Sequence, residues 1–369
     1  MKTRRASEPR IENVKVGAFR IPTETPESDG TLQWSSTTLV VVELAAADLR
    51  GIGFTYAEAA VGTLIRDALA PVAIGRSAWD IAALGEAMAA RLRNGGREGA
   101  SAMAVSAMDV ALWDLKAKSL DLPLARLFGQ VRDALPAYGS GGFTSYSDEQ
   151  LERQFSEWTS LGFTRFKMKF GREPGRDPQR FAAARRAVGA GAELFADANS
   201  AFGRREALQW AERLAANWGV TWFEQPLVPY DLDGLLFLRD RSPASLEIAD
   251  GEYGYTGDYF RRLLEAGAVD VVMADATRCG GFTGFLKAAA LCEVWAMPLS
   301  SHCAPALHLA VGCAAKPMRH AEYFFDHARI ERLLFDGCAI PEGGVLRPDL
   351  SRPGLGLEFK WADAERYQA

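Results

Sequence analysis

Three short acidic segments recur at nearly equal spacing in the second half of the chain, and each is an apolar stretch that ends in a carboxylate. The carboxylates are Asp197, Glu224 and Glu252, about 27 residues apart, which is roughly the length of one strand–helix unit of a (β/α) barrel. Successive parallel strands would therefore each bring one carboxylate to the same rim. Three oxygen ligands that leave room for water or substrate are typical of Mg²⁺, and so we predict a divalent metal site.

The choice of ligands leaves alternatives in two of these segments. Asp197 could instead be the N-cap of a helix that follows its strand. In the third segment, Glu247 and Asp250 compete with Glu252. We prefer Glu252 because it ends the strand and because the preceding Gly251 gives the backbone room to approach a ligand.

Two lysines, Lys167 and Lys169, lie two residues apart in a strand-like segment, so their side chains share one face while the apolar neighbours take the other. A buried lysine without a partner is costly, so an inward-facing pair implies anions or a substrate nearby. The alternative is an edge strand whose lysines are solvated. Asp197 and Asn199 have the same spacing, and Asn199 is therefore a candidate substrate-binding residue at the rim.

An acid–base pair is expected from two further strand ends. Asp275 ends one apolar run and His302 ends the next, so neighbouring barrel strands would bring them together. An aspartate that accepts a hydrogen bond from one imidazole nitrogen fixes the tautomer and raises the basicity of the histidine. Glu322, on the last strand, could meet the same pocket, although a surface charge is the alternative. The remaining histidines, His308, His320 and His327, have no comparable context.

Composition excludes several classes of function. The chain has 369 residues, 48% of them hydrophobic, and a net charge of −5, which disfavours nucleic acid and anionic membranes as partners. The basic N-terminus, residues 1–6, is not followed by an apolar run of signal-peptide length, and no run of about 18 apolar residues occurs. The five cysteines form no C-x-x-C pair. We expect reduced thiols in a soluble cytoplasmic protein.

The N-terminal third has the pattern of an α+β domain. Strand-like segments are expected at Ile11 to Ile21, Thr37 to Leu44 and Gly51 to Tyr56, with a polar loop from Pro22 to Ser36. Residues 59–128 then have helical periodicity, most clearly from Ala100 to Leu120. We predict a capping domain over residues 1–130, completed by the C-terminal tail from about 340 to 369.

Residues 131–339 are predicted to form a (β/α) barrel of the TIM type with seven or eight strands, so the fold class is α/β. Each expected strand is apolar and is followed by a helical stretch. The eight strands are expected at residues 137–140, 165–169, 194–199, 221–225, 246–252, 269–275, 297–302 and 320–324. Ser140 ends the first of them and is a candidate for substrate contact.

These features together resemble the enolase superfamily, and within it the mandelate racemase subgroup of acid-sugar dehydratases and racemases. The resemblance spans nearly the whole chain. It is carried by the Lys167-Met-Lys169 motif, the three carboxylates and the Asp275–His302 pair. The helical segment of residues 107–116 also resembles a helix of the capping domain that is common in this superfamily.

The resemblance also separates subgroups. Muconate-cycloisomerase-like members carry a lysine at the end of the sixth strand, as the base opposite the paired lysines. Here the stretch from Val269 to Gly281 contains no lysine and offers Asp275 and Arg278 instead, with a histidine on the next strand. The chain is therefore more similar to the subgroup with an Asp–His pair.

The resemblance implies removal of the proton α to a substrate carboxylate, with one Mg²⁺ held by the three carboxylates. Lys167 is expected to help hold the substrate carboxylate. Lys169 is expected to be the base on one face, with a pKa depressed by Lys167 and the metal. His302, supported by Asp275, is expected on the opposite face. Glu322 would donate a hydrogen bond to the carboxylate oxygen if it is protonated.

The implied reaction is dehydration of a polyhydroxylated sugar acid to a 2-keto-3-deoxy acid. Racemisation or epimerisation and lactone cycloisomerisation are alternatives through the same enediolate, and a barrel that binds metal and ligand without turnover is the alternative from another class. The segments Pro22 to Ser36 and Gly51 to Ala60, including Tyr56 as a substrate contact, would cover the site, and their polarity suits hydroxyl groups. We expect a small-molecule carboxylate as substrate and a symmetric homo-oligomer.

Overall fold

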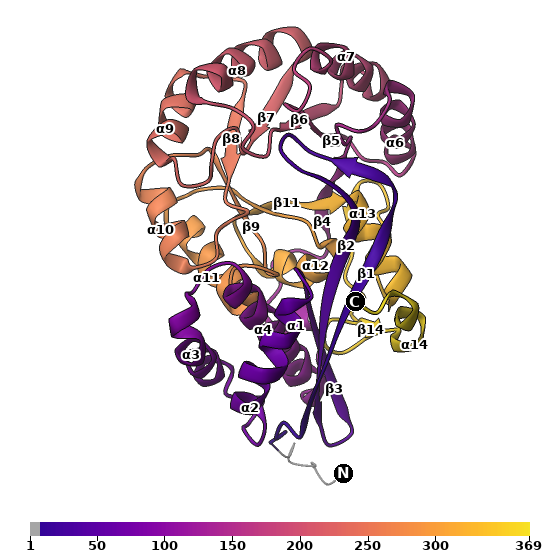
Figure 1. Ribbon diagram of the computed structural model, residues 1–369, viewed down its shortest axis with the longest axis vertical. Helices are drawn as coiled ribbons and strands as arrows, with labels where there is room; N and C mark the ends of the chain where they lie inside the picture. Colours follow the sequence, from indigo (N-terminus) through magenta and orange to yellow (C-terminus); the bar gives the residue numbers. More distant parts are fainter. Residues whose placement is uncertain (1–7) are drawn as a thin grey trace.

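The computed structural model describes residues 8–369, and the first seven residues, including the basic N-terminal segment, lie outside this range. A three-stranded antiparallel sheet with its helices lies beside a closed barrel of parallel strands (Figure 1). The expected α/β barrel with an N-terminal cap is therefore confirmed. Among the described residues, no helix combines the length and the apolar character needed to cross a bilayer.

The cap sheet consists of β1 (Asn13–Ser28), β2 (Gln33–Ala46) and β3 (Leu49–Tyr56), paired in the order β1-β2-β3. Side chains of β2 alternate between two cores: Leu39 and Val41 contribute to the one shared with the barrel, and Val40 and Val42 to the other. The period of two follows from the pleat of a strand. The cap sheet is therefore buried on both faces.

The cap helices are α1 (Ala60–Leu64), η1 (Ile65–Leu69), α2 (Ala70–Ala73), α3 (Ile81–Leu92), η2 (Arg93–Gly95), α4 (Ala100–Ser119) and α5 (Leu124–Leu127). Helices α1, η1, α2, α3 and α4 share the core on the face of the sheet that carries Val40 and Val42, and α4 also lies against the barrel helix of residues 281–294 (Figure 1). Helix α4 approaches β3 so closely that a Cβ at Gly53 would lie 2.0 Å from the carbonyl oxygen of Ala107. Only glycine leaves room for this contact.

The expectation of a loop from Pro22 to Ser36 is wrong, because most of this stretch forms a long hairpin of β1 and β2. The register shifts between Pro22 and Glu27, and only residues 29–32 turn. Polar residues follow one another in this ribbon, so the apolar alternation that identifies a strand is missing. The tip reaches the barrel at the ends of β5 and β6 (Figure 1), where Thr31 Oγ1 donates to the carbonyl of Asn199 at 3.2 Å.

The barrel contains all eight expected strands. They are β4 (Leu135–Gly141), β5 (Arg165–Lys169), β6 (Glu193–Asp197), β7 (Val220–Glu224), β8 (Glu247–Asp250), β9 (Val271–Ala274), β10 (Leu299–Ser301) and β11 (Met318–Phe324), and β11 pairs with β4 to close the barrel. A buried cluster that includes Tyr138, Phe195 and Trp222 fills the interior. The polar site must therefore lie at the carboxyl ends of the strands.

Helices follow the strands and form the outer ring. They are α6 (Asp148–Ser160), α7 (Asp177–Val188), α8 (Arg204–Trp218), α9 (Leu232–Arg241), α10 (Gly257–Glu265), α11 (Gly281–Val294), α12 (Pro305–Ala314) and α13 (Phe325–Leu334). Helix α6 begins with a capping box in which Ser147 Oγ accepts from Gln150 N and the Gln150 side chain accepts from Ser147 N. Such a box satisfies two otherwise unpaired backbone donors.

The C-terminal tail returns to the cap, as expected. It contains β12 (Phe335–Asp336), β13 (Val345–Leu346), β14 (Glu358–Phe359), α14 (Trp361–Ala364) and η3 (Glu365–Tyr367). The ring of Phe359 lies 5.3 Å from that of Phe19 on β1, and Trp361 Nε1 donates to Glu43 on β2. Burial of these aromatic rings holds the tail against the cap sheet.

Candidate active site

Four neighbouring strands bring acidic and basic side chains to one rim of the barrel. The parallel register places Lys169, Asp197 and Glu224 side by side at the ends of β5, β6 and β7. Glu252 lies two residues beyond the end of β8, after Gly251 at φ 133°. A Cβ at Gly251 would lie 2.2 Å from the carbonyl oxygen of Met273, so the turn that delivers Glu252 requires glycine.

The three predicted ligands converge. Asp197, Glu224 and Glu252 are buried, and each offers an oxygen within 4.8 Å of the others. Burial and the neighbouring Asp197 carboxylate raise the pKa of Glu224 well above its usual value. Oxygen Oε2 of Glu252 is buried and lies 3.2 Å from His302 Nε2 without forming an aligned hydrogen bond. A cluster of hard oxygen atoms with excess negative charge fits Mg²⁺, so this triad can bind the metal.

The alternatives for the third ligand lie elsewhere. Glu247 begins β8, at the opposite end of the strand, and pairs with Arg319 at 2.8 Å. Asp250 is buried, but its Oδ1 accepts from the backbone N–H of Gly251 at 2.6 Å, and it does not belong to the carboxylate triad. Asn199 lies two residues after the first ligand, and its backbone N–H donates to Asp197 Oδ1 at 3.0 Å.

Both lysines point into the barrel, where carboxylates surround them. The Nζ of Lys167 contacts Glu224 and lies 2.8 Å from Glu322 Oε1, and Lys169 Nζ lies 2.5 Å from Asp197 Oδ2. The solvated edge strand is thereby excluded. Burial lowers the pKa of Lys169, but Asp197 more than offsets it, and the pKa is raised. Without a metal on Asp197, its attraction exceeds the repulsion of Lys167, and the expected depression of this pKa by Lys167 and a bound metal stays a prediction.

His302 and Asp275 form the expected pair on the other side of the triad. His302 Nδ1 lies 2.8 Å from Asp275 Oδ2, and Asp275 Oδ1 accepts from the backbone N–H of Thr277 at 2.7 Å. His302 Nε2 lies 3.2 Å from Glu252 Oε2. Burial lowers the pKa of His302, but Cys303, Glu252 and Asp275 more than offset it, and the pKa is raised. The Nε2 atom thus lies beside Glu252, whereas Lys169 contacts Asp197.

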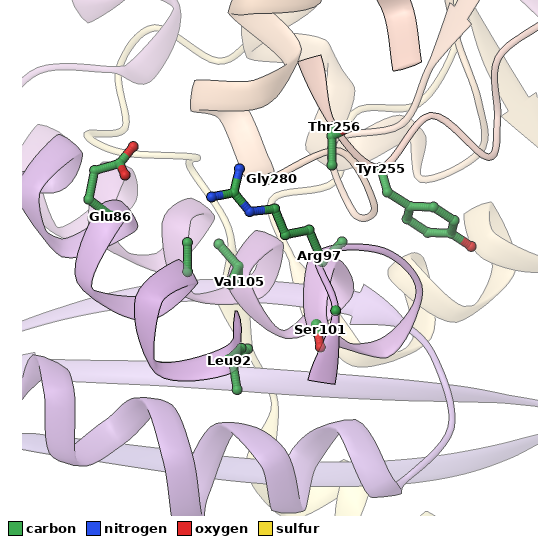
Figure 2. A pocket seen from close by; sticks show the side chains of 11 residues that line it. Glu86, Leu92, Arg97, Ser101, Val105, Tyr255, Thr256 and Gly280 are labelled. Carbon is green, nitrogen blue, oxygen red and sulfur yellow. The ribbon is translucent and has the colours of Figure 1, made fainter. Parts of the chain in front are cut away.

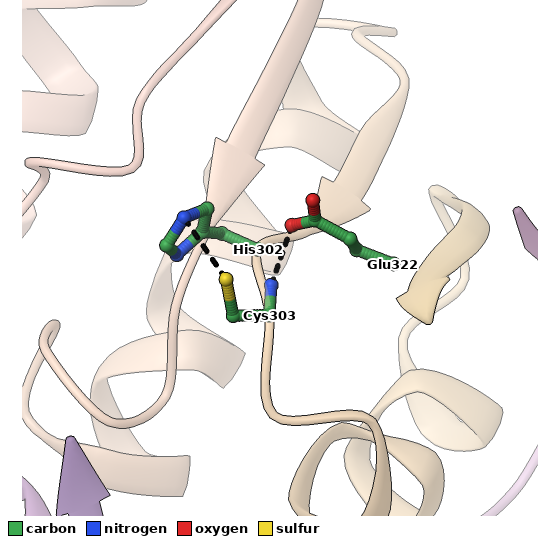
Figure 3. A group of neighbouring side chains, drawn as sticks. All are labelled: His302, Cys303 and Glu322. Atoms are coloured by element: carbon green, nitrogen blue, oxygen red, sulfur yellow. Dashed lines mark hydrogen bonds between the residues drawn. The ribbon is translucent and has the colours of Figure 1, made fainter. Parts of the chain in front are cut away.

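Glu322 is fully buried and accepts hydrogen bonds at both oxygens. Oε1 accepts from Ser140 Oγ at 2.6 Å and from Lys167, and Oε2 accepts from the backbone N–H of Cys303 at 2.6 Å (Figure 3). Burial raises the pKa of Glu322, but the charge of Lys167 outweighs it, and the pKa is lowered. The expectation that Glu322 donates is therefore wrong, and so is the surface-charge alternative. The Ser140 hydroxyl is committed to Glu322.

Tyr56 reaches the barrel from the end of β3. Its ring stacks on that of His327 at 3.4 Å between centroids, and its hydroxyl donates to the carbonyl of His327 at 3.4 Å. The Nδ1 of His327 in turn accepts from the backbone N–H of Ala304, two residues after His302. A side chain of the cap is thus connected to the segment that carries the predicted proton carrier.

Two residues that the sequence did not assign belong to the site. Arg278 Nη1 lies 3.5 Å from Glu252 Oε1, and its Nε lies 3.6 Å from Asp275 Oδ2, so it links the triad to the Asp–His pair. Cys303 places its Sγ 3.2 Å from His302 Nε2 (Figure 3). The sequence could have indicated both residues only by their positions, since Arg278 lies three residues after Asp275 and Cys303 directly follows His302.

Several residues just beyond the strand ends have left-handed backbone, although none is glycine. They are Asn199 (φ 45°), Ser200 (φ 67°), Gln225 (φ 40°), Cys303 (φ 51°) and Ala304 (φ 40°). Such conformations are costly for residues with a Cβ and are concentrated at functional sites. The backbone turns sharply after three of the strands that carry the candidate catalytic and metal-binding residues.

A separate cavity of about 150 Å³ lies between the cap and the barrel (Figure 2). Arg97, Ser101 and Val105 line it from the cap, and Tyr255 and Thr256 line it from the loop after β8. None of the predicted site residues lines this cavity. We therefore place the candidate active site at the strand ends.

Two family models match the chain. The N-terminal domain of mandelate racemase/muconate lactonizing enzyme matches residues 14–129, and the enolase C-terminal domain-like model matches residues 150–364. Among curated proteins, 3,6-anhydro-alpha-L-galactonate cycloisomerase of Streptomyces coelicolor is 32% identical over 95% of this chain and 98% of its own length. L-talarate/galactarate dehydratase of Salmonella typhimurium is 31% identical over 85% of this chain and 81% of its own length.

Solved structures have the same fold. A mandelate racemase/muconate lactonizing enzyme-like protein from Rubrobacter xylanophilus is 49% identical, with a TM-score of 0.96 over 98% of this chain and 100% of its own. A racemase from Streptomyces coelicolor with bound magnesium is 30% identical, with a TM-score of 0.91 over 97% of this chain and 100% of its own. The chain therefore belongs to the enolase superfamily and, within it, to the mandelate racemase subgroup.

Proposed function

We propose that the chain is a Mg²⁺-dependent enzyme that removes the proton α to the carboxylate of a polyhydroxylated acid and dehydrates the acid to a 2-keto-3-deoxy acid. The observation that carries the proposal is the placement of two proton carriers around one carboxylate triad. Lys169 contacts Asp197 at one side of the triad, and His302 Nε2 lies 3.2 Å from Glu252 at the other. A carbon acid between them would meet a proton carrier on each face.

Asp197, Glu224 and Glu252 would hold Mg²⁺, which when bound would stabilise negative charge on the substrate carboxylate. Lys167 lies between Glu224 and Glu322 with its ammonium group fully buried, so it would hold the same carboxylate. Glu322 fixes the position of Lys167 and of the Cys303 backbone. A negatively charged substrate would therefore enter a site whose cations are already oriented.

The Asp275 carboxylate accepts the Nδ1–H of His302, and this leaves Nε2 to take or give the transferred proton. After Lys169 has removed the α-proton, His302 would donate its proton to the departing β-hydroxyl. The hydroxyl leaves as water and the enol product becomes the 2-keto-3-deoxy acid. If His302 instead protonates the α-carbon, the product is an epimer, and the two outcomes differ only in the substrate atom that meets Nε2.

The names of related proteins support an acid-sugar substrate but include both dehydratases and cycloisomerases. Dehydration is our principal proposal because several curated relatives are dehydratases of sugar acids. Lactone cycloisomerisation is the second candidate, because D-galactarolactone cycloisomerase of Agrobacterium fabrum is 28% identical over 91% of this chain. A homo-oligomeric state and a cytoplasmic location stay predictions.

Incubation with a library of sugar acids, with and without Mg²⁺, tests the proposal. Semicarbazide detection of a 2-keto acid would mark dehydration, and entry of solvent deuterium at the α-carbon without net reaction would mark racemisation or reversible proton removal. Lactone loss without a 2-keto product would support cycloisomerisation. The absence of turnover and of exchange across a broad library would contradict the enzymatic proposal and favour a barrel that only binds its ligand.

A further inference from the structure

A cavity of about 250 Å³ lies between the cap and the barrel rim, beside the candidate active site. Trp34 and Thr37 line it from β2, Tyr56 from β3, and Phe324 and His327 from the end of β11 and the start of α13. Tyr56 and His327, whose rings stack, form one wall. The cavity is therefore bounded by both parts of the fold.

Phe324 connects this cavity to the proton carriers. The centroid of its ring lies 5.7 Å from Lys169 Nζ and 5.0 Å from the centroid of the His327 ring. A substrate whose α-carbon meets Lys169 would extend its other end past Phe324 toward His327. The cavity thus lies where the distal part of a sugar acid would be.

The cavity offers uncharged hydroxyl groups and one carboxylate. Thr37 Oγ1 donates its hydrogen to Asp326 Oδ2 at 2.5 Å, so the oxygen presents lone pairs to a ligand. Ser36 and Thr38 add hydroxyl groups that can donate or accept, and Glu58 lines the cavity with an exposed carboxylate. His327 can donate, because its Nδ1 accepts from the backbone N–H of Ala304 at 3.3 Å, and the neutral ring must therefore carry its hydrogen on Nε2.

No cation compensates for these acceptors within the cavity, since none of its lining residues in the described chain is lysine or arginine. Burial lowers the pKa of His327 well below its usual value, so its ring stays neutral. The neighbouring Arg329 donates to Asp326 Oδ1 at 2.6 Å and to the carbonyl of Pro22 at 2.8 Å. Its charge is therefore already paired.

We propose that this cavity binds the uncharged, hydroxylated end of a monocarboxylic sugar acid and discriminates against dicarboxylic acids. The inference rests on the proposed function and adds the substrate class. A terminal hydroxyl can donate to Thr37 or Glu58 and accept from His327, whereas a second carboxylate can only accept and would lose hydration without gaining a counterion. Talarate and galactarate, which appear in the name of one relative, are dicarboxylic acids.

Matched pairs of substrates test the inference directly. D-gluconate and D-glucarate, or D-galactonate and galactarate, differ only in whether C6 is a hydroxymethyl group or a carboxylate. With Mg²⁺ and a panel of such pairs, we expect kcat/KM for the reactive monocarboxylic acids to exceed that of their dicarboxylic partners by about 100-fold or more. Equal or faster turnover of the dicarboxylic acids would overturn the inference and leave the proposed function intact. Silence from every acid, in turnover and in α-deuterium exchange, would overturn both.

A charge reversal at the cavity provides the second test. In Glu58→Lys we expect the preference to move toward dicarboxylic acids by about fivefold, and in Glu58→Gln by about twofold, because the exposed charge is partly screened. Glu212→Lys makes the same change at an exposed position on α8 and is the matched control. A preference that is the same in Glu58→Lys and Glu212→Lys would show that the distal group does not meet this cavity.

Discussion

Replacement of Asp275 by asparagine tests whether the Asp275 carboxylate keeps His302 able to donate a proton. Asp275 Oδ1 accepts from the backbone N–H of Thr277 at 2.7 Å, and Oδ2 lies 2.8 Å from His302 Nδ1. In Asp275→Asn, the amide oxygen must stay with the Thr277 N–H, and the amide NH₂ group then faces His302. The imidazole has to accept at Nδ1, so its hydrogen moves to Nε2. The variant would keep the geometry, but it would lack the Asp275 charge that stabilises the imidazolium, so the neutral ring would be a much weaker acid toward the departing hydroxyl.

The expected loss follows from the missing charge. Removal of the aspartate charge beside the catalytic imidazole of the serine-protease triad lowers kcat by about 10⁴-fold, which corresponds to about 5.5 kcal/mol in the barrier, and we expect a loss of the same order here. Dehydration requires His302 to return a proton to the leaving hydroxyl, so the 2-keto-3-deoxy product should fall by this factor. Exchange of the α-proton by Lys169 does not involve His302 and should be retained.

Two measurements on the same protein make the prediction decisive. Product formation is followed with semicarbazide, and α-exchange is followed by NMR in deuterium oxide. Asp258→Asn, at a side chain that is 82% exposed on α10, is the matched control and should leave both rates unchanged. A loss of dehydration smaller than about tenfold would refute the assigned role of the Asp275 charge. An equal loss of exchange and dehydration would show that Lys169 does not act independently.

Three further predictions concern the metal and the stability of the fold. Saturating Mg²⁺ should raise the Tm of the wild-type protein, because a ligand at 100 times its Kd stabilises the folded state by about 2.7 kcal/mol. In Glu224→Gln the rise in Tm should be much smaller. A wild-type Tm that does not change with Mg²⁺ would contradict the metal site. Burial raises the pKa of Asp109 to about 7, above the 3.8 of the unfolded chain, so this residue should contribute a fall in stability of about 4 kcal/mol as the pH rises through this window. Asp109→Asn should remove this contribution, and urea unfolding at pH 4 and pH 8 would show a gain over wild type mainly at the higher pH. The same gain at both values would refute the assignment. Gly53→Ala should destabilise the fold by about 1–3 kcal/mol, since its Cβ would lie 2.0 Å from the Ala107 carbonyl oxygen. Gly85→Ala on α3, where a Cβ would have nothing within 4 Å, is the control and should be neutral or stabilising. Similar Tm values for the two variants would contradict the close packing of β3 on α4.

The sequence by itself determined the barrel and the composition of its rim. Asp197 and Glu224 each close an apolar run, and the parallel register places residues at equivalent strand ends next to each other. The two-residue spacing of Lys167 and Lys169 determined a shared face in the same way. These patterns are local, because the geometry of a single strand sets the face and the end at which each side chain lies.

Only the tertiary structure decided the states and partners of these groups. The charge of Glu322 depends on Lys167, which is far away in the sequence, so its acceptor role could not be read from neighbouring residues. The same holds for Arg278, which gains its place by contacting both Glu252 and Asp275, and for the stacking of Tyr56 on a histidine of α13. Electrostatic and packing energies depend on distance in space, and in this fold the decisive short distances join different strands and different domains.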